Sequence, residues 1–140
     1  MHKKVQVVIV DISRKPFRVL LLKTNQKRGS FWQNVTGSAE GNETFYQAAI
    51  RELSEETKLS ANKLIDLDFS FTFASDQGDV VEQCYLAILQ KTPEKVEISE
   101  KEHQDYKWAM ANEITESQYK YPSNYQAFLK AKVHCEKFKA

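Results

Sequence analysis

The sequence of 140 residues contains few of the residues that crosslink or interrupt a chain. Its two cysteines, Cys84 and Cys135, are too few to hold a metal cluster, and both lie in apolar stretches, so we expect reduced thiols in or near the core. It has only four glycines and three prolines, and it shows no internal repeat, low-complexity tract or linker. The length is that of one domain, and we expect residues 1–140 to form a single domain.

An excess of charge of one sign and long apolar runs are also missing. The 20 basic and 19 acidic side chains give a formal net charge of +1, which disfavours binding to nucleic acid through bulk charge. No apolar run approaches the roughly 20 residues of a membrane-spanning helix, and the apolar stretch near the N-terminus is too short and too polar for a signal peptide. We therefore expect a cytoplasmic protein, monomeric or homodimeric, with neither a membrane nor a nucleic acid as its partner.

Hydrophobic residues make up 41% of the chain, enough for a packed core, and their spacing predicts a mixture of strands and helices. Strands are expected at Val5–Ile12, Arg18–Lys23, Asp68–Ala74 and Val80–Leu89, with shorter extended segments at Phe31–Thr36 and Tyr106–Ala109. The first two strands are expected to form a hairpin. Loops are expected at Gly37–Asn42 and Lys91–Asp105. The mixture predicts an α/β or α+β fold in one layered domain.

Two segments have the pattern of helices. The clearer one is Thr44–Leu59, in which Thr44 and Gln47 are spaced for a capping box. Its core-facing side is expected to consist of Tyr46, Ala49, Ile50, Leu53 and Thr57. A last helix is expected to begin at Ser123, with Gln126 in the capping-box position and an apolar face made of Tyr125, Phe128, Leu129 and Phe138.

A stripe of three glutamates, Glu52, Glu55 and Glu56, lies along the second half of the first helix. Glu52 and Glu56 are four residues apart, and a like-charged pair at this spacing destabilises a helix by about 0.2–0.5 kcal/mol. The helix macrodipole also disfavours anions in this half. The stripe is either an ordinary solvated face or a set of converging oxygens for a hard divalent cation such as Mg²⁺, whose coordination would replace the repulsion.

The residues around the stripe decide between these interpretations. Gly37 is followed by Glu43, then by the run Arg51-Glu52-Leu53-Ser54-Glu55-Glu56, and Leu59 closes the pattern. This spacing resembles the Nudix box, G-x5-E-x7-R-E-U-x-E-E-x-G-U, in which U is a bulky aliphatic residue. Every defined position matches except that Lys58 stands where the family usually has glycine. The resemblance implies a Nudix-type α/β/α sandwich with a mixed β-sheet between helices, and an enzyme that hydrolyses phosphoanhydride bonds.

The same resemblance implies the metal ligands. Glu52 and Glu56 are the leading ligands for Mg²⁺, with Mn²⁺ as an alternative, and Glu55 is a third ligand, direct or through water. The backbone carbonyl at Gly37 or its neighbour is a further ligand, because glycine lets the backbone approach the metal. Glu102, from a later loop, is also expected among the metal ligands. Such a metal neutralises the charge that develops on a phosphate during hydrolysis.

Residues with other catalytic roles follow from the match as well. Arg51 is expected to orient the acidic cluster, and Glu43 to support the loop at the positive end of the helix. If the helical glutamates all bind metal, the general base lies elsewhere, and Glu102 in a later loop is the residue that the resemblance offers. The alternatives are that Glu102 is only a surface acid, or that Glu55 or the metal itself activates the water.

Other stretches resemble bacterial dihydroneopterin triphosphate pyrophosphatases of this family. They are Phe31–Ser38, Glu102-His103 before Tyr106-Lys107-Trp108, and Ser123–Ala127. These relatives carry an arginine just after the second strand, which this sequence lacks at that point.

Four residues are candidates for binding the substrate. Trp32 is expected either to stack on a base or pterin ring or to pack between two elements of the core. Thr36 lies beside the loop glycine and is placed to hydrogen-bond a phosphate or a ring, and Lys4 and Lys23 are candidate phosphate contacts.

The first choice of function is a Mg²⁺-dependent pyrophosphohydrolase that converts dihydroneopterin triphosphate, dATP or another nucleoside triphosphate into a monophosphate and pyrophosphate. Within the enzyme class, the alternatives are dinucleoside polyphosphates and RNA 5′ ends. From another class, a Nudix-fold sensor would bind a nucleotide without cleaving it, but such modules typically lose the acids of the box, and this chain keeps them all.

Overall fold

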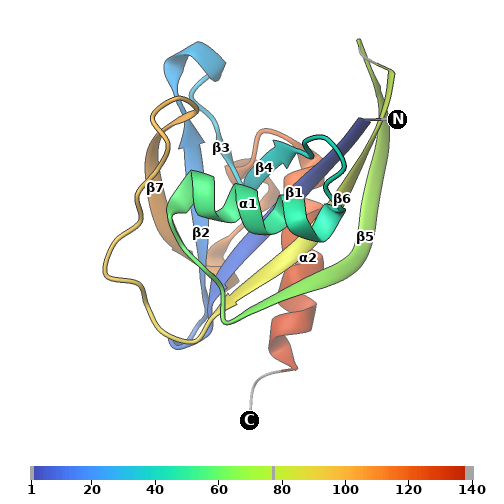
Figure 1. Cartoon of the computed structure of the whole chain (residues 1–140). Helices are drawn as coiled ribbons and strands as arrows, with labels where there is room; N and C mark the ends of the chain where they lie inside the picture. The colour runs from blue at the N-terminus through green and yellow to red at the C-terminus, as the bar shows by residue number, and fades with distance from the viewer. Residues whose placement is uncertain (1, 77, 138–140) are drawn as a thin grey trace.

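In the part of the chain that the structure describes, seven strands form one mixed β-sheet, and a helix covers each of its faces (Figure 1). The structure is a computed structural model that describes residues 2–76 and 78–137. The strands are β1 (His2–Asp11), β2 (Arg18–Thr24), β3 (Trp32–Gln33), β4 (Val35–Ser38), β5 (Lys63–Ser75), β6 (Gly78–Leu89) and β7 (His103–Met110). The helices are α1 (Phe45–Thr57) and α2 (Pro122–Glu136), and 3₁₀ turns occur at Gln26–Arg28, Ala111–Glu113 and Glu116–Gln118. The expected α/β sandwich with a mixed sheet between helices is confirmed.

Strand β1 lies at the centre of the sheet. One of its edges pairs with β6 in parallel along the whole of β1, and the other edge is shared by the antiparallel strands β4 and β2. The sheet continues from β2 to β3 and β7, and from β6 to β5, always antiparallel. The antiparallel pairing of β1 with β2 confirms the expected hairpin.

Alternate residues of β1 face opposite helices. Val5, Val7 and Ile9 pack in the cluster beneath α1, whereas Val8 and Val10 pack in the cluster beneath α2. A strand that is covered on both faces needs apolar residues at successive positions, which explains the nearly continuous apolar run at the start of the chain.

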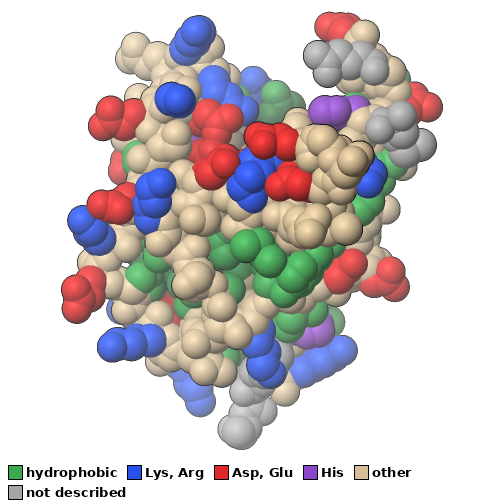
Figure 2. Space-filling model, in the orientation of Figure 1, with side chains coloured by type: hydrophobic (Ala, Val, Ile, Leu, Met, Phe, Trp, Pro, Cys, Tyr) green, Lys and Arg blue, Asp and Glu red, His purple; other side chains and the backbone are tan. Residues whose placement is uncertain are grey.

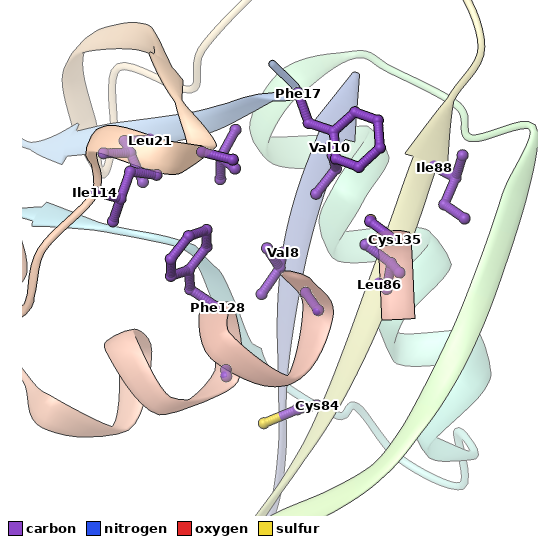
Figure 3. Close-up of a cluster of buried hydrophobic side chains, with 14 of the residues drawn as sticks. Val8, Val10, Phe17, Leu21, Cys84, Leu86, Ile88, Ile114, Phe128 and Cys135 are labelled. Carbon is purple, nitrogen blue, oxygen red and sulfur yellow. The ribbon is translucent and has the colours of Figure 1, made fainter. Parts of the chain in front are cut away.

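The core beneath α2 closes the second face of the sheet. Phe128 and Cys135 of α2 pack with Val8 of β1 and Leu86 of β6 (Figure 3). Cys84 and Cys135 are both fully buried free thiols, as expected. Neither described helix is long and apolar enough to cross a membrane.

Some predicted loop residues belong to strands. Gly37 and Ser38 were expected to begin a loop, but they pair with β1 as the end of β4. His103, which was expected in the loop Lys91–Asp105, begins β7 by pairing with Thr24. In both cases the extended conformation comes from backbone pairing with a neighbouring strand, and the residues themselves show no alternating apolar pattern that predicts it.

Strand β5 also begins earlier than expected, at Lys63 rather than Asp68. Its pairing with β6 shifts register between Asp66 and Ser70, and Asp68 has a left-handed φ of 53°. This irregularity interrupts the alternation of side chains between the two faces of the sheet. Only the second half of the strand therefore shows alternating apolar and polar residues in the sequence.

Helix α1 is rotated about its axis relative to the orientation that the sequence predicted. Tyr46 and Ile50 were expected in the core but are 47% and 48% exposed, because α1 turns Glu52 and Glu56 inward beside Ala49.

The predictions for α2 were partly wrong. Leu129 is exposed, and Phe138 lies outside the described residues. The helix begins at Pro122 after Tyr121, with no side-chain cap, so the capping box predicted from Ser123 is wrong.

Candidate active site

Local sequence signals fix both ends of α1. Thr44 Oγ1 accepts a hydrogen bond from the backbone N–H of Gln47 at 3.1 Å, and Gln47 Oε1 accepts one from the N–H of Thr44 at 3.0 Å, so the capping box is confirmed. At the other end Lys58 has a left-handed φ of 60°, and its N–H donates to the carbonyl of Ser54. Glycine adopts this conformation most readily, which explains physically why the Nudix box usually has glycine where this chain has lysine.

Arg51 connects the acidic side chains of α1 to the loop before the helix. Its Nε and Nη2 donate to the two carboxylate oxygens of Glu43 at 2.9 and 3.0 Å, and Nη2 also donates to the carbonyl of Ser38 at 2.8 Å. Its Nη1 donates to Glu52 Oε1 at 2.9 Å and to Glu55 Oε2 at 3.1 Å. These acidic partners, Glu43 first, raise the pKa of Arg51, so the guanidinium stays charged and holds the carboxylates in place.

Gly37 leaves room for the carboxylate of Glu52. A Cβ atom at Gly37 would lie 2.0 Å from Cδ of Glu52, closer than any real contact between carbon atoms. Glycine is therefore required here because the glutamate side chain from α1 rests against the backbone of β4.

Two loops place Glu102 opposite the helix. The backbone N–H of Asn25 donates to the carbonyl of Glu102 at 2.9 Å, and Asn25 Nδ2 donates to the carbonyl of Lys101 at 3.0 Å. Arg28 Nη1 lies 3.6 Å from Glu102 Oε1 in a partly exposed ion pair. The position of this late loop is thus determined by the loop that follows β2.

A buried histidine lies behind the acidic cluster. His103 is 1% exposed, and its Nε2 accepts a hydrogen bond from Gln33 Nε2 at 3.1 Å, which leaves the ring proton on Nδ1. Nδ1 lies 3.0 Å from Glu56 Oε1, but neither atom forms an aligned hydrogen bond within the described residues. Burial lowers the pKa of His103 to about 4, so the ring is neutral and the contact is not an ion pair.

The carboxyl groups of the cluster disfavour one another's ionisation. Burial raises the pKa of Glu52 and of Glu56, which are only 7% and 3% exposed. A hydrogen bond to Glu56, together with burial, raises the pKa of Glu102 to about 7. Such a group of partly buried acids would be stabilised by a cation.

The donor set fits a divalent metal. Ligand atoms of Glu56, Glu102 and His103 lie within 4.8 Å of one another. The two carboxylates are the donors free to bind an ion, because His103 carries its proton on Nδ1 and accepts from Gln33 at Nε2. Oε1 of Glu56 is a buried oxygen that no hydrogen bond satisfies in the described part of the chain, and metal coordination would satisfy it. Carboxylate oxygens are the ligands that Mg²⁺ prefers.

The cluster lines an open cavity of about 680 Å³ between α1, β4 and the two loops; we call it the acidic cavity. It brings together most of the residues that the sequence pointed to: Lys4, Thr36, Gly37, Arg51, Glu52, Glu55, Glu56 and Glu102. Figure 2 shows carboxylates gathered around basic side chains on the face that carries α1.

A second cavity of about 600 Å³, the aromatic cavity, adjoins the first. The two cavities share Lys4, Arg28 and Thr36, so they meet at these residues. The walls of the aromatic cavity include the rings of Phe31, Phe71, Phe73 and Tyr121.

Trp32 and Lys23 are not among the described residues that line either cavity. Trp32 packs against the core cluster beneath α2, with Lys107 Nζ 4.3 Å from its ring centre, which is the packing role that the sequence left open. Its neighbour Phe31 points to the aromatic cavity instead, because successive residues of an extended segment face opposite sides.

Sequence reasoning missed Arg28 and Glu82, both of which line the aromatic cavity. Arg28 lies in a polar loop and gave no signal of its own. Glu82 did give one, because it alternates in phase with the buried residues Val80, Cys84 and Leu86 and is therefore an acid on the apolar side of a strand.

A family model described as the NUDIX domain matches residues 2–131. The chain belongs to the Nudix family. This Nudix protein is 31% identical over 134 residues to a dihydroneopterin triphosphate diphosphatase of Haemophilus influenzae, with 84% of this chain and 83% of the relative covered. It is 43% identical over 72 residues to an octanoyltransferase of Myxococcus xanthus, a match that spans 51% of this chain but only a fifth (20%) of that protein. Among solved structures, it resembles the dihydroneopterin triphosphate pyrophosphohydrolase of Escherichia coli, with 29% identity, a TM-score of 0.78, and coverage of 94% of this chain and 95% of that one.

Membership of the family establishes the class of reaction. This Nudix hydrolase belongs to a family that acts on phosphoanhydride bonds of phosphorylated small molecules and typically uses a divalent metal. The acidic cavity is the place where the described residues fit such chemistry.

Proposed function

We propose that this Nudix hydrolase cleaves a triphosphate attached to a flat heteroaromatic compound between its α and β phosphates, releasing a monophosphate and pyrophosphate. Dihydroneopterin triphosphate is the first candidate, and dATP or another nucleoside triphosphate is the second. The observation that carries the proposal is that the two cavities adjoin at Lys4, Arg28 and Thr36, since one cavity suits a metal-bound polyphosphate and the other suits a ring. The 31% identity to the H. influenzae diphosphatase supports the first candidate.

We assign the metal to the carboxylates of Glu52, Glu55 and Glu56, together with the backbone carbonyl at Gly37, with the carboxylate of Glu102 beside the ion. Mg²⁺, or Mn²⁺ in its place, would supply positive charge that draws in the phosphates and stabilises the charge developing on them. Nδ1 of His103 lies 3.0 Å behind Oε1 of Glu56, so its buried ring blocks that carboxylate from turning away from the cavity.

The remaining residues bind, orient and move a proton. Arg51 fixes Glu52 and Glu55, and Glu43 in turn fixes Arg51. Lys4 and Arg28, at the junction of the cavities, contact the phosphates.

Glu102 accepts the proton of the attacking water. The new bond forms between water oxygen and phosphorus, and the bond that breaks is the P–O bond to the leaving pyrophosphate. Glu102 suits this role because its carboxylate lines the acidic cavity from the side opposite α1.

A substrate panel with Mg²⁺ tests the proposal. We expect dihydroneopterin triphosphate or a nucleoside triphosphate to give pyrophosphate and the corresponding monophosphate, detected by chromatography of the products. Release of orthophosphate alone, or preference for dinucleoside polyphosphates or triphosphorylated RNA, would overturn it. Binding of a triphosphate without turnover would instead indicate a nucleotide sensor.

A further inference from the structure

A buried acid forms part of the wall of the aromatic cavity. Glu82 lies on β6, is 5% exposed, and is far in the chain from the acids of the Nudix box. Burial raises its pKa, although Lys4 and a hydrogen bond from Gln6 act in the opposite direction. Burying a carboxyl group lowers the stability of the folded protein, so the position of Glu82 needs a functional explanation.

A chain of hydrogen bonds from Asn124 through Asn34 and Gln6 determines that the side chain of Glu82 accepts a hydrogen bond. Asn34 Nδ2 donates to the backbone carbonyl of Asn124 at 3.1 Å, which fixes that end of the amide as the nitrogen. The same Nδ2 donates to Gln6 Oε1 at 2.7 Å, so Gln6 must present its Nε2 to Glu82, where it donates to Oε2 at 2.9 Å. A carboxylate that already receives one N–H bond is held ready to accept more.

The surroundings of Glu82 suit the edge of a flat ring. Phe71 lies directly opposite Glu82 in the pairing of β5 with β6, and Phe31 and Tyr121 meet edge to face with their ring centres 5.4 Å apart. These rings offer apolar faces for stacking, while Glu82 offers the one acidic group among the described residues that line this cavity. Lys4, opposite Glu82 in the β1–β6 pairing, lies toward the acidic cavity where a triphosphate would extend.

We propose that Glu82 selects substrates whose ring carries a lactam N–H next to an exocyclic amino group, the arrangement found in guanine and in 2-amino-4-oxopteridines. The inference rests on the proposed function and narrows its substrate class. The two neighbouring N–H groups donate to the two oxygens of Glu82. Adenine and cytosine present an acceptor nitrogen beside their amino group, and uracil and thymine present carbonyl oxygens beside their N–H, so none of them offers this pair of donors.

The test compares dGTP, dITP and dATP in the parent enzyme and in Glu82→Gln. Hypoxanthine keeps the lactam N–H and lacks the amino group, so dITP isolates one of the two contacts. In the parent we expect kcat/KM for dGTP to exceed that for dITP and for dATP by about 10- to 100-fold, as for a lost hydrogen bond to a charged group. In Glu82→Gln we expect the ratio of dGTP to dITP to fall to about 1, because an amide offers only one acceptor.

Glu94→Gln is the matched control, since it removes the same charge from an exposed position outside both cavities, and it should keep the parent ratios. Circular dichroism and the Tm of both variants check that they fold. Equal kcat/KM for the three triphosphates in the parent, or an equal loss for all three in Glu82→Gln, would overturn the inference.

Calorimetric Kd values for dGMP and dIMP, measured without metal, separate the inference from the proposed function. If no triphosphate is hydrolysed, the proposed function fails, yet tighter binding of dGMP than dIMP by the parent and not by Glu82→Gln still supports the ring contact. If hydrolysis proceeds but dGMP and dIMP bind the parent equally, the proposed function stands and the role of Glu82 is wrong.

Discussion

The two buried glutamates of the acidic cavity, Glu52 and Glu56, are each positioned by contacts with specific neighbouring residues. Glu52 rests against Gly37, and its Oε1 accepts a hydrogen bond from Arg51. Glu56 has His103 behind it. Both acids are nearly as buried as the aliphatic core. Burying a carboxylate lowers the stability of the folded protein, and proteins accept this loss at functional sites.

The close packing of Gly37 on Glu52 predicts the effect of adding one methyl group. In Gly37→Ala the new Cβ would displace the carboxylate of Glu52, whose side chain moves more easily than the backbone of β4. We expect kcat/KM to fall by about 100-fold or more, since misplacing a group at the reacting centre by about 1 Å has this effect. Gly41→Asn is the control, because Gly41 has open space around it and asparagine tolerates its left-handed φ of 52°. Equal activity of the two variants would contradict the packing role of Gly37.

Glu102 gives a prediction that separates proton transfer from binding. If it is the general base, Glu102→Gln should lower kcat by about 10²–10⁴ and change KM little, because the metal and the basic residues bind the phosphates. Glu100→Gln is the control, since it lies exposed in the same loop. Steady-state kinetics on the best substrate of the panel measure both. Loss of activity in Glu100→Gln alone would show that the base was assigned two residues too late, and two active variants would assign water activation to the helix or to the metal.

At the scale of elements, α1 was predicted well in extent and poorly in orientation. The spacing of Thr44 and Gln47 fixed its start, because the capping box is a local interaction. The apolar residues Tyr46 and Ile50 were placed inside because a helical wheel assigns the most apolar side of a helix to the core, while the surroundings of the glutamate stripe were left open. Only the contacts of Glu52 and Glu56 with β4 and β7 reverse that assignment, and those contacts join segments distant in the sequence.

The left-handed end of α1 predicts that a substitution toward the family pattern stabilises the protein. A residue with a side chain at φ 60° is strained, and glycine is not, so Lys58→Gly should raise the free energy of unfolding by about 0.5–1 kcal/mol. Urea denaturation at constant m measures the difference. Ser54→Gly, at an exposed position inside the helix, should instead lower the free energy by about 0.5 kcal/mol. A decrease in both variants would show that the conformation at Lys58 is not strained.

At the scale of the whole molecule, most residues of the acidic cavity could be named from the sequence, whereas the aromatic cavity could not. The residues of the Nudix box are close in the chain, and their spacing places them on α1, on the end of β4 and on the loop between them. The aromatic cavity and its hydrogen-bond chain combine residues from β1, β6, α2 and the segment between β3 and β4. No local pattern links Gln6 to Glu82 or Asn34 to Asn124, because the sheet and the α2 packing alone bring them together.

The buried carboxylates of the acidic cavity predict how a bound metal changes the thermal stability of the whole molecule. Without metal, Glu52 and Glu56 are buried like charges, so Glu56→Gln should unfold at a Tm at least as high as that of the parent. A ligand that binds only the folded state at 100 times its Kd adds about 2.7 kcal/mol, which is roughly 8–10 °C for a chain of this size. We therefore expect Mg²⁺ to raise the Tm of the parent by several degrees and that of Glu56→Gln by little, while the variant loses triphosphate hydrolysis by orders of magnitude.

Differential scanning fluorimetry over a Mg²⁺ titration measures these shifts, with Glu94→Gln as the control for loss of one negative charge. An equal Mg²⁺ shift in the parent and in Glu56→Gln would place the bound metal away from this carboxylate. A variant that unfolds at a much lower Tm without metal would show that Glu56 is needed for the fold, because the repulsion relieved would then be smaller than the packing lost around His103.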